Sequence, residues 1–178
     1  MKHLILGGAR SGKSRYAEQQ AQHCADQHQQ QLWYVATATR GDGEMVLRIQ
    51  EHQVRRGEQW QLIEEPIDLV SQLNRLNSED NCVLIDCLTL WLSNILIAEE
   101  AGELGLDWEK IKPLFLQALT SCKASVFMVS NEVGSGIVPM GELSRQFVDE
   151  SGWLHQDLAT TCDQVSLVTA GLPLALKQ

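Results

Sequence analysis

The chain has no surplus of positive charge. Its 14 Lys and Arg residues are outnumbered by 23 Asp and Glu residues, which gives a formal net charge of −9 at pH 7. A general nucleic-acid surface or an anionic-membrane surface needs a basic face. The composition therefore argues against both partners, and any phosphate that the protein binds must be held by a local site.

Clustered cysteines and long apolar runs are also missing. The five cysteines are widely spaced, with no CxxC motif and no Cys/His cluster, so we expect reduced, buried thiols rather than disulfides or a zinc site. The longest apolar run, 88–98, is interrupted by Ser93 and Asn94, and the run that directly precedes the first glycine pair has only three apolar residues. Neither stretch is long enough for a membrane span or a signal peptide, and we expect a cytoplasmic protein.

Short apolar runs typical of β-strands alternate with segments of helical periodicity. The runs are 4–6, 32–35, 60–63, 83–85, 126–129 and 165–168. This alternation predicts an α/β fold in which a mostly parallel sheet carries helices on both faces. The length of 178 residues fits a single domain over 1–178, with a solvated connection predicted between Glu99 and Asp107.

The strongest motif is Gly7-Gly8-Ala9-Arg10-Ser11-Gly12-Lys13-Ser14, which fits G-x-x-x-x-G-K-[ST] between a predicted strand and a predicted helix. Its glycines let backbone N–H groups face phosphate oxygens, and the helix N-terminus adds partial positive charge. Lys13, expected to be exposed, would reach the β- and γ-phosphates, and Ser14 would ligate Mg²⁺. The motif predicts a binding site for a nucleoside triphosphate.

Acidic residues follow two other predicted strands. Asp86 comes directly after the run 83–85, where a phosphate-bound Mg²⁺ needs a carboxylate, although an Asp at this position also serves as a cap for the next turn. The segment 130–134 (SNEVG) ends another strand, where parallel sheets bind ligands. Glu132 could hold a substrate or metal there, or the segment could be only a turn before the helix that begins near Gly141.

One charged segment, 44–56, lacks proline and internal glycine and predicts a helix. Four-residue steps place Glu44, Arg48, His52 and Arg56 along one slowly drifting face. Flanking arginines disfavour the imidazolium form of His52, so its ring stays neutral and nucleophilic, and they could grip phosphates. A solvated, charged helix face without a chemical role is the alternative interpretation.

Taken together, these segments resemble a known family. They are GGARSGKSRYAE, YVATA, EMVLRIQEHQVRRGEQWQLIEEP, LIDCLTLWLSN and VSNEVGSGIVPMGELSRQFVDESGWLHQDLA. The chain resembles the bifunctional adenosylcobinamide kinase / adenosylcobinamide-phosphate guanylyltransferases of cobalamin biosynthesis over nearly its whole length. The phosphate loop alone fits many nucleotide-binding proteins, whereas RI-x-x-H together with SNEVG-x-G-x-VP is highly specific.

The resemblance implies two reactions on one RecA-like P-loop NTPase domain. Adenosylcobinamide is phosphorylated with ATP or GTP, and GMP is then transferred from GTP to that phosphate through a GMP-histidine intermediate, for which His52 matches the carrier. The resemblance also implies Mg²⁺, no prosthetic group and a homotrimer. The nucleotide-contacting positions that it implies are Gly7, Gly8, Ala9, Arg10, Ser11, Gly12, Lys13, Ser14, Thr37, Ala38, Thr39, Gln53, Val54, Arg55, Arg56, Glu64 and Asp86.

Two departures from the family pattern stand out. The family often has H-R-x-x-R-P where this chain has His52-Gln53-Val54-Arg55-Arg56-Gly57, and G-M-G is replaced by Gly134-Ser135-Gly136. Neither departure removes a residue with an assigned chemical role. A kinase that leaves His52 idle and a regulatory nucleotide-dependent ATPase are the alternative functions.

Overall fold

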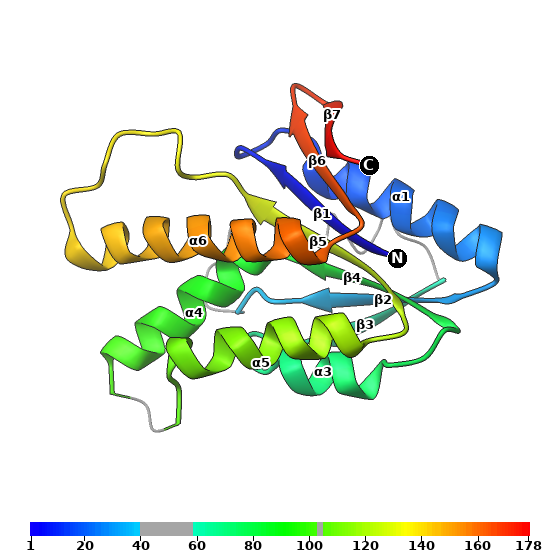
Figure 1. The fold of residues 1–178 in the computed structure, drawn as a ribbon, viewed down its shortest axis with the longest axis horizontal. Helices are drawn as coiled ribbons and strands as arrows, with labels where there is room; N and C mark the ends of the chain where they lie inside the picture. Colours follow the sequence, from blue (N-terminus) through cyan, green and yellow to red (C-terminus); the bar gives the residue numbers. More distant parts are fainter. Residues whose placement is uncertain (40–58, 103–104) are drawn as a thin grey trace.

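The computed structural model describes residues 1–39, 59–102 and 105–178. A seven-stranded sheet crosses this part of the chain in the order β3-β2-β4-β5-β1-β6-β7 (Figure 1). The neighbouring pairs from β3 to β6 are parallel, and β7 is antiparallel to β6. The strands are β1 (Lys2–Gly7), β2 (Gln31–Ala36), β3 (Trp60–Glu64), β4 (Asn81–Asp86), β5 (Ser125–Asn131), β6 (Gln164–Thr169) and β7 (Leu172–Lys177).

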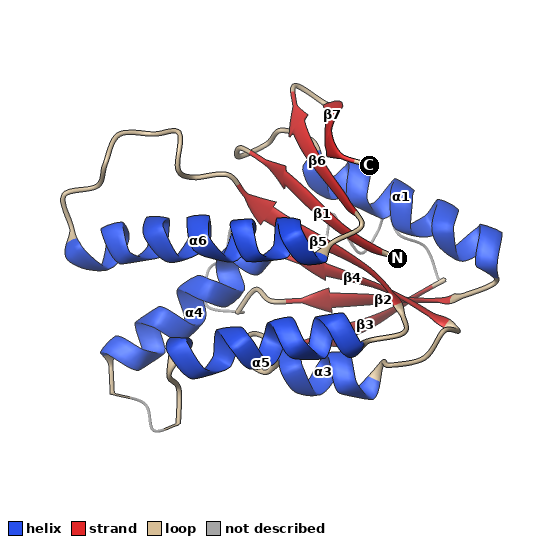
Figure 2. Ribbon diagram, in the orientation of Figure 1, coloured by secondary structure: helices blue, strands red, loops and turns tan. Residues whose placement is uncertain are grey.

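Helices cover both faces of the sheet, as the alternating pattern predicts. One helix lies behind the sheet in the view of Figure 2, and the other described helices lie in front of it. Within the described ranges, no helix combines the length and the apolar character that crossing a membrane would require. The helices are α1 (Lys13–His28) on the first face, and α3 (Leu69–Arg75), α4 (Leu88–Glu100), α5 (Trp108–Ser121) and α6 (Glu142–Thr161) on the second.

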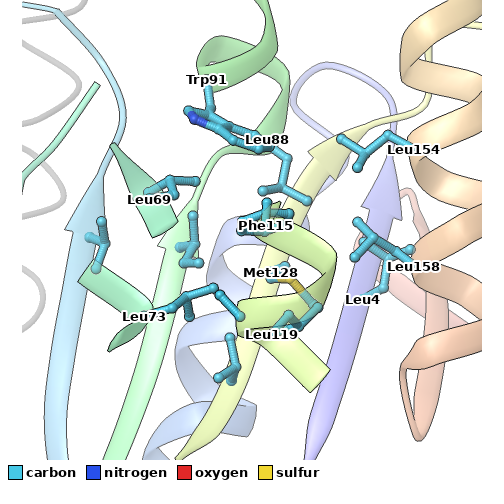
Figure 3. Close-up of a cluster of buried hydrophobic side chains, with 14 of the residues drawn as sticks. Leu4, Leu69, Leu73, Leu88, Trp91, Phe115, Leu119, Met128, Leu154 and Leu158 are labelled. Carbon is cyan, nitrogen blue, oxygen red and sulfur yellow. The ribbon is translucent and has the colours of Figure 1, made fainter. Parts of the chain in front are cut away.

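Two hydrophobic cores result from the alternation of side chains along buried strands. Ile5 of β1 packs on the α1 side with Ala17 and Ala21, whereas its neighbour Leu4 faces the larger core on the other side. Figure 3 shows this larger core, in which Trp91 of α4 lies against Phe115 of α5 with ring centroids 4.5 Å apart. Burying each such side chain stabilises the fold by about 1.5–3 kcal/mol.

The six strands predicted from sequence are confirmed as β1 to β6, but β7 was not predicted. All six residues of β7 are exposed, and Pro173 lies inside the strand. A strand at the edge of a sheet tolerates proline because only one side of its backbone is hydrogen-bonded. The predicted connection 99–107 was too long, because α4 continues to Glu100, and Asp107 caps α5 by accepting from Lys110 N.

The register brings the carboxyl ends of the strands to one edge. Ala36 of β2 pairs with both Glu64 of β3 and Asp86 of β4, and Asp86 pairs in turn with Val129 of β5. Gly7 of β1 lies opposite Asn131. Parallel sheets bind ligands beyond this edge, so the predicted site residues at the strand ends face a shared region.

Candidate functional site

The loop between β1 and α1 has the backbone that the glycine motif predicts. A Cβ at Gly7 would lie 2.5 Å from both Val168 O and Ser11 Oγ, so a side chain does not fit there. Gly12 has φ +94°, a conformation that glycine adopts without strain, and it caps the N-terminus of α1. The loop is held in place by Ser11, whose N–H donates to Gly8 O and whose carbonyl accepts from Gly171 N at 2.8 Å.

Lys13 is the first residue of α1, and its position corrects the expectation of an exposed loop lysine. The residue is only 9% exposed, and its Nζ donates to Gly8 O at 3.1 Å. The ammonium group is thus folded back over its own loop. A cation in this position lies where the loop N–H groups and the helix N-terminus already favour an anion.

Asp86 at the end of β4 shares its surroundings with Lys13. Its Oδ2 accepts a 2.9 Å hydrogen bond from Tyr34 OH. Burial and, to a lesser extent, the Asp86 carboxylate raise the pKa of the neighbouring Cys87 thiol to about 11, and the Lys13 ammonium opposes the shift. Both charges therefore act on the same sulfur, which indicates that they lie close together although β5 separates their strands.

The segment that follows β2 is hydrogen-bonded to the backbone next to Asp86. Thr37 is fully buried, and its hydroxyl both donates to Cys87 O and accepts from Cys87 N, at 2.7 Å each. Asn94 of α4 donates to Thr37 O and to Pro66 O. The Thr37 hydroxyl therefore holds the backbone next to Asp86 in place, whereas Thr39, two residues later, is exposed. Glu64, at the end of β3, is also exposed.

A hydrogen-bonded chain joins the other strand end to two helices. Ser130 Oγ is 2.7 Å from His155 Nε2 of α6 and 3.2 Å from Thr89 Oγ1 of α4, and Thr89 accepts from Asn131 N. Burial lowers the pKa of His155, and the nearby Glu132 carboxylate opposes the shift. A neutral imidazole thus fixes the end of β5, and Glu132 N donates to Gly7 O of the phosphate loop.

Part of the predicted site lies outside the described residues. The helix predicted over 44–56 belongs to that segment, together with His52 and its neighbours Gln53, Val54, Arg55 and Arg56. The structure brings the phosphate loop, Asp86 and Glu132 to one edge of the sheet, and the roles assigned to the site residues stay predictions.

Sequence reasoning missed the supporting residues of the site. Tyr34, Thr89, Asn94 and His155 come from separate elements and act only through the contacts that the fold creates. Motif spacing carries no signal for them. Each becomes visible only once the strand order and the packing of α4 and α6 are known.

The fold and the phosphate loop define a P-loop nucleotide-binding protein of the RecA-like α/β class. In agreement, the structure is similar to a solved ATPase domain, with a TM-score of 0.50 at 17% identity, covering 93% of this chain and 68% of that one. At this identity the likeness concerns the fold alone.

The family follows from the sequence comparisons. The family model described as cobinamide kinase / cobinamide phosphate guanyltransferase matches residues 3–176, and the chain belongs to this family of bifunctional enzymes. The bifunctional adenosylcobalamin biosynthesis protein CobP of Pseudomonas aeruginosa is 46% identical over 99% of this chain and 98% of its own length. CobU of Escherichia coli, with the same bifunctional description, is 34% identical over 99% of this chain and its full length.

Proposed function

We propose that this chain phosphorylates the aminopropanol hydroxyl of adenosylcobinamide with ATP or GTP and then transfers GMP from GTP to the new phosphate. The observation that carries the proposal is the family match over residues 3–176, combined with a phosphate loop in which Lys13 Nζ donates to Gly8 O. Both reactions use a nucleoside triphosphate, which a site of this kind binds.

For the kinase step, we assign the triphosphate to the loop 7–14. Backbone N–H groups and the Lys13 ammonium would hold the phosphate oxygens, and the acceptor oxygen would form the new P–O bond as the nucleoside diphosphate leaves. The Ser14 hydroxyl and the Asp86 carboxylate fit Mg²⁺, because this cation takes oxygen ligands and is usually held by one or two carboxylates and phosphate oxygens. When bound, Mg²⁺ would neutralise charge on the phosphates.

For the guanylyl step, we assign His52 as the carrier of GMP. A ring nitrogen would form a bond to the α-phosphorus of GTP while pyrophosphate leaves with the electrons of the broken P–O bond. An oxygen of adenosylcobinamide phosphate would then attack the same phosphorus and break the P–N bond. The support is the match to RI-x-x-H and the spacing of Arg48 and Arg56, each four residues from His52, which is about one turn of the helix that the sequence predicts. Thr37, Ala38, Thr39, Gln53, Val54, Arg55, Arg56 and Glu64 complete the proposed nucleotide contacts.

The test is a reconstitution with purified protein, adenosylcobinamide, Mg²⁺ and either ATP or GTP. Mass spectrometry of the corrinoid should show the gain of one phosphoryl group and, with GTP, of one GMP. Phosphorylation without GMP gain would instead indicate a kinase that leaves His52 idle. Triphosphate hydrolysis that leaves the corrinoid unchanged would indicate a regulatory ATPase.

A homotrimer is part of the same proposal. Its support is an unusually apolar edge strand: Leu172, Leu174 and Leu176 of β7 are all more than half exposed, as is Trp153 of α6. Exposed edges and apolar surface of this kind are commonly covered by another chain. Sedimentation equilibrium should give three times the chain mass of 19.9 kDa, and a monomer at micromolar concentration would contradict the assignment.

We also propose that residues 1–178 form a single cytoplasmic domain. The seven-stranded sheet takes strands from both ends of the described chain, and all five cysteines are buried free thiols, the state that a reducing compartment maintains. One cooperative unfolding transition is expected for a single domain. Two separated transitions would indicate independent units.

A further inference from the structure

The loop that connects β5 to α6, residues 132–141, carries several apolar side chains. Ile137 is 98% exposed, Met140 is 97% exposed and Val138 is 74% exposed, although the loop is anchored at both ends. Gly134 N donates to Glu132 Oε1 at 2.7 Å, and Arg145 of α6 donates to the carbonyl oxygens of residues 139 and 140. These residues lie in the yellow segment between β5 and α6 in Figure 1, and their apolar side chains are exposed although the backbone is anchored.

Beside this loop lies a groove between α4 and α6 with a volume of about 270 Å³. None of the side chains that line it is charged, and two of them carry hydroxyl groups. The lining residues are Ser93, Leu96, Ile97, Pro139, Leu143, Ser144, Phe147 and Val148. Pro139 belongs to both features, so the groove and the apolar loop form one continuous surface, which we call the loop–groove surface.

The loop–groove surface is connected to the phosphate loop through the end of β5. Glu132 N donates to Gly7 O, and Ile137, the first of the three exposed apolar residues, follows five residues later. On the other side of the groove, α4 begins directly after Asp86 and Cys87. Both segments that border the groove therefore lead to the edge of the sheet where the phosphate loop lies.

We propose that the loop–groove surface binds the corrin macrocycle of the acceptor, with Ile137, Val138 and Met140 against its methyl-bearing face. This inference rests on the proposed function. A corrinoid is a large, flat ring with apolar faces and a fringe of neutral amides, and it carries the acceptor hydroxyl on a flexible side arm. The arm can then enter the phosphate-loop region while the ring stays outside.

The chemistry of the surface favours this occupant over a nucleotide. A nucleotide brings several negative charges, and none of the described residues that line the groove is a cation that could meet them. The hydroxyl groups of Ser93 and Ser144 suit neutral amides. The groove is smaller than the roughly 300–1,000 Å³ of pockets that enclose a drug-sized ligand, so it takes one edge of the macrocycle while the ring lies across the apolar loop.

The test compares the double substitution Ile137→Ser and Met140→Ser with Leu114→Ser as a matched control. Leu114 is a half-exposed leucine of α5 that lines neither the groove nor the phosphate loop. Kinase assays should give the double variant a KM for adenosylcobinamide at least about tenfold higher than the unsubstituted protein, because each lost apolar contact typically reduces affinity by about that factor. The KM for the nucleoside triphosphate should stay within twofold, and the control should change neither constant.

Two further measurements separate the possible failures of this KM comparison. An unchanged KM for the corrinoid would overturn the proposal. If the double variant instead dissociates in the ultracentrifuge and recovers its KM at higher protein concentration, a second copy of the chain covers the surface, and the proposal is also wrong. Equilibrium dialysis of adenosylcobinamide against the unsubstituted protein distinguishes the two proposals: binding that the double substitution weakens, without phosphorylation, would contradict the proposed function and support the corrinoid surface.

Discussion

The two ends of β1 each carry a buried lysine, and the partners of the two lysines differ. Lys2 at the amino end and Lys13 just beyond the carboxyl end are both 9% exposed. Lys2 Nζ donates to Cys122 O at 2.8 Å and to Ala124 O at 2.7 Å, and its backbone N–H donates to Asp163 Oδ2. These contacts tie α5 and the starts of β5 and β6 to β1.

Lys13 instead folds back onto Gly8 O, inside its own loop, beside a helix N-terminus and near the Asp86 carboxylate. Burial lowers the pKa of Lys2, and the thiol of Cys122 and the carboxylate of Asp163 oppose the shift. Burial alone therefore does not distinguish a functional lysine from a structural one. The contacts of the side chain do, because Lys2 stabilises the amino end of the sheet, whereas Lys13 adds positive charge where an anion is favoured.

The largest effect is expected for Lys13→Ala. Both kinase turnover and guanylyl transfer should fall by at least about a hundredfold, since removing one preorganised donor to a reacting group typically costs that much. The loss of the hydrogen bond from Lys13 Nζ to Gly8 O should by itself lower the free energy of unfolding by about 1 kcal/mol. Steady-state assays and urea unfolding check both values. Turnover within twofold of the unsubstituted protein would contradict the phosphate-loop assignment.

Buried His3, at the amino end of β1, should make the free energy of unfolding depend on pH. Burial lowers the pKa of His3 to about 4, from 6.5 in an unfolded chain. The unfolded chain therefore binds the proton more readily, and the stability that neutral His3 provides is complete above pH 6.5 and is lost as the pH falls to 4. The loss should reach about 3 kcal/mol. In urea titrations between pH 6.5 and 4, the free energy of unfolding of His3→Gln should fall less than that of the unsubstituted protein. The same pH dependence in both proteins would contradict this role of His3.

Lys2→Met tests the structural lysine directly. The substitution keeps most of the aliphatic volume but leaves Cys122 O and Ala124 O without their donor, so we expect a loss of about 2 kcal/mol of unfolding free energy. Turnover per folded molecule should be unchanged. Reduced turnover at unchanged stability would show that the contrast between the two lysines is wrong.

The smallest effect is expected for Asp86→Asn, which keeps the shape of the side chain and removes its charge. The Mg²⁺ concentration for half-maximal turnover should rise about tenfold, because the metal loses an anionic ligand. Tyr34→Phe, which keeps the ring and removes the hydrogen bond to Asp86 Oδ2, is the matched control and should shift the Mg²⁺ requirement less. An unchanged requirement in Asp86→Asn would make Asp86 a turn-capping residue.

The sequence predicted the features that depend on local patterns, and it did not predict those that depend on contacts between distant residues. Strands buried on both faces, such as 83–85, are apolar at every position and were predicted correctly, as was the phosphate loop, whose glycines are required by local geometry. Lys2 and His155 gave no signal, because their roles depend on partners more than 20 residues away. β7 was missed because an exposed edge strand with an internal proline carries no pattern of burial.

Covalent labelling tests most directly whether this one chain carries out guanylyl transfer as well as phosphoryl transfer. Purified protein is incubated with Mg²⁺ and GTP labelled at the α-phosphate, and the label on denatured protein is measured alongside His52→Asn. We expect an acid-labile, base-stable label of one GMP per chain, absent from His52→Asn, which should retain much of its kinase activity. Label that persists in His52→Asn, with continued pyrophosphate release, would show that His52 is not the carrier of GMP.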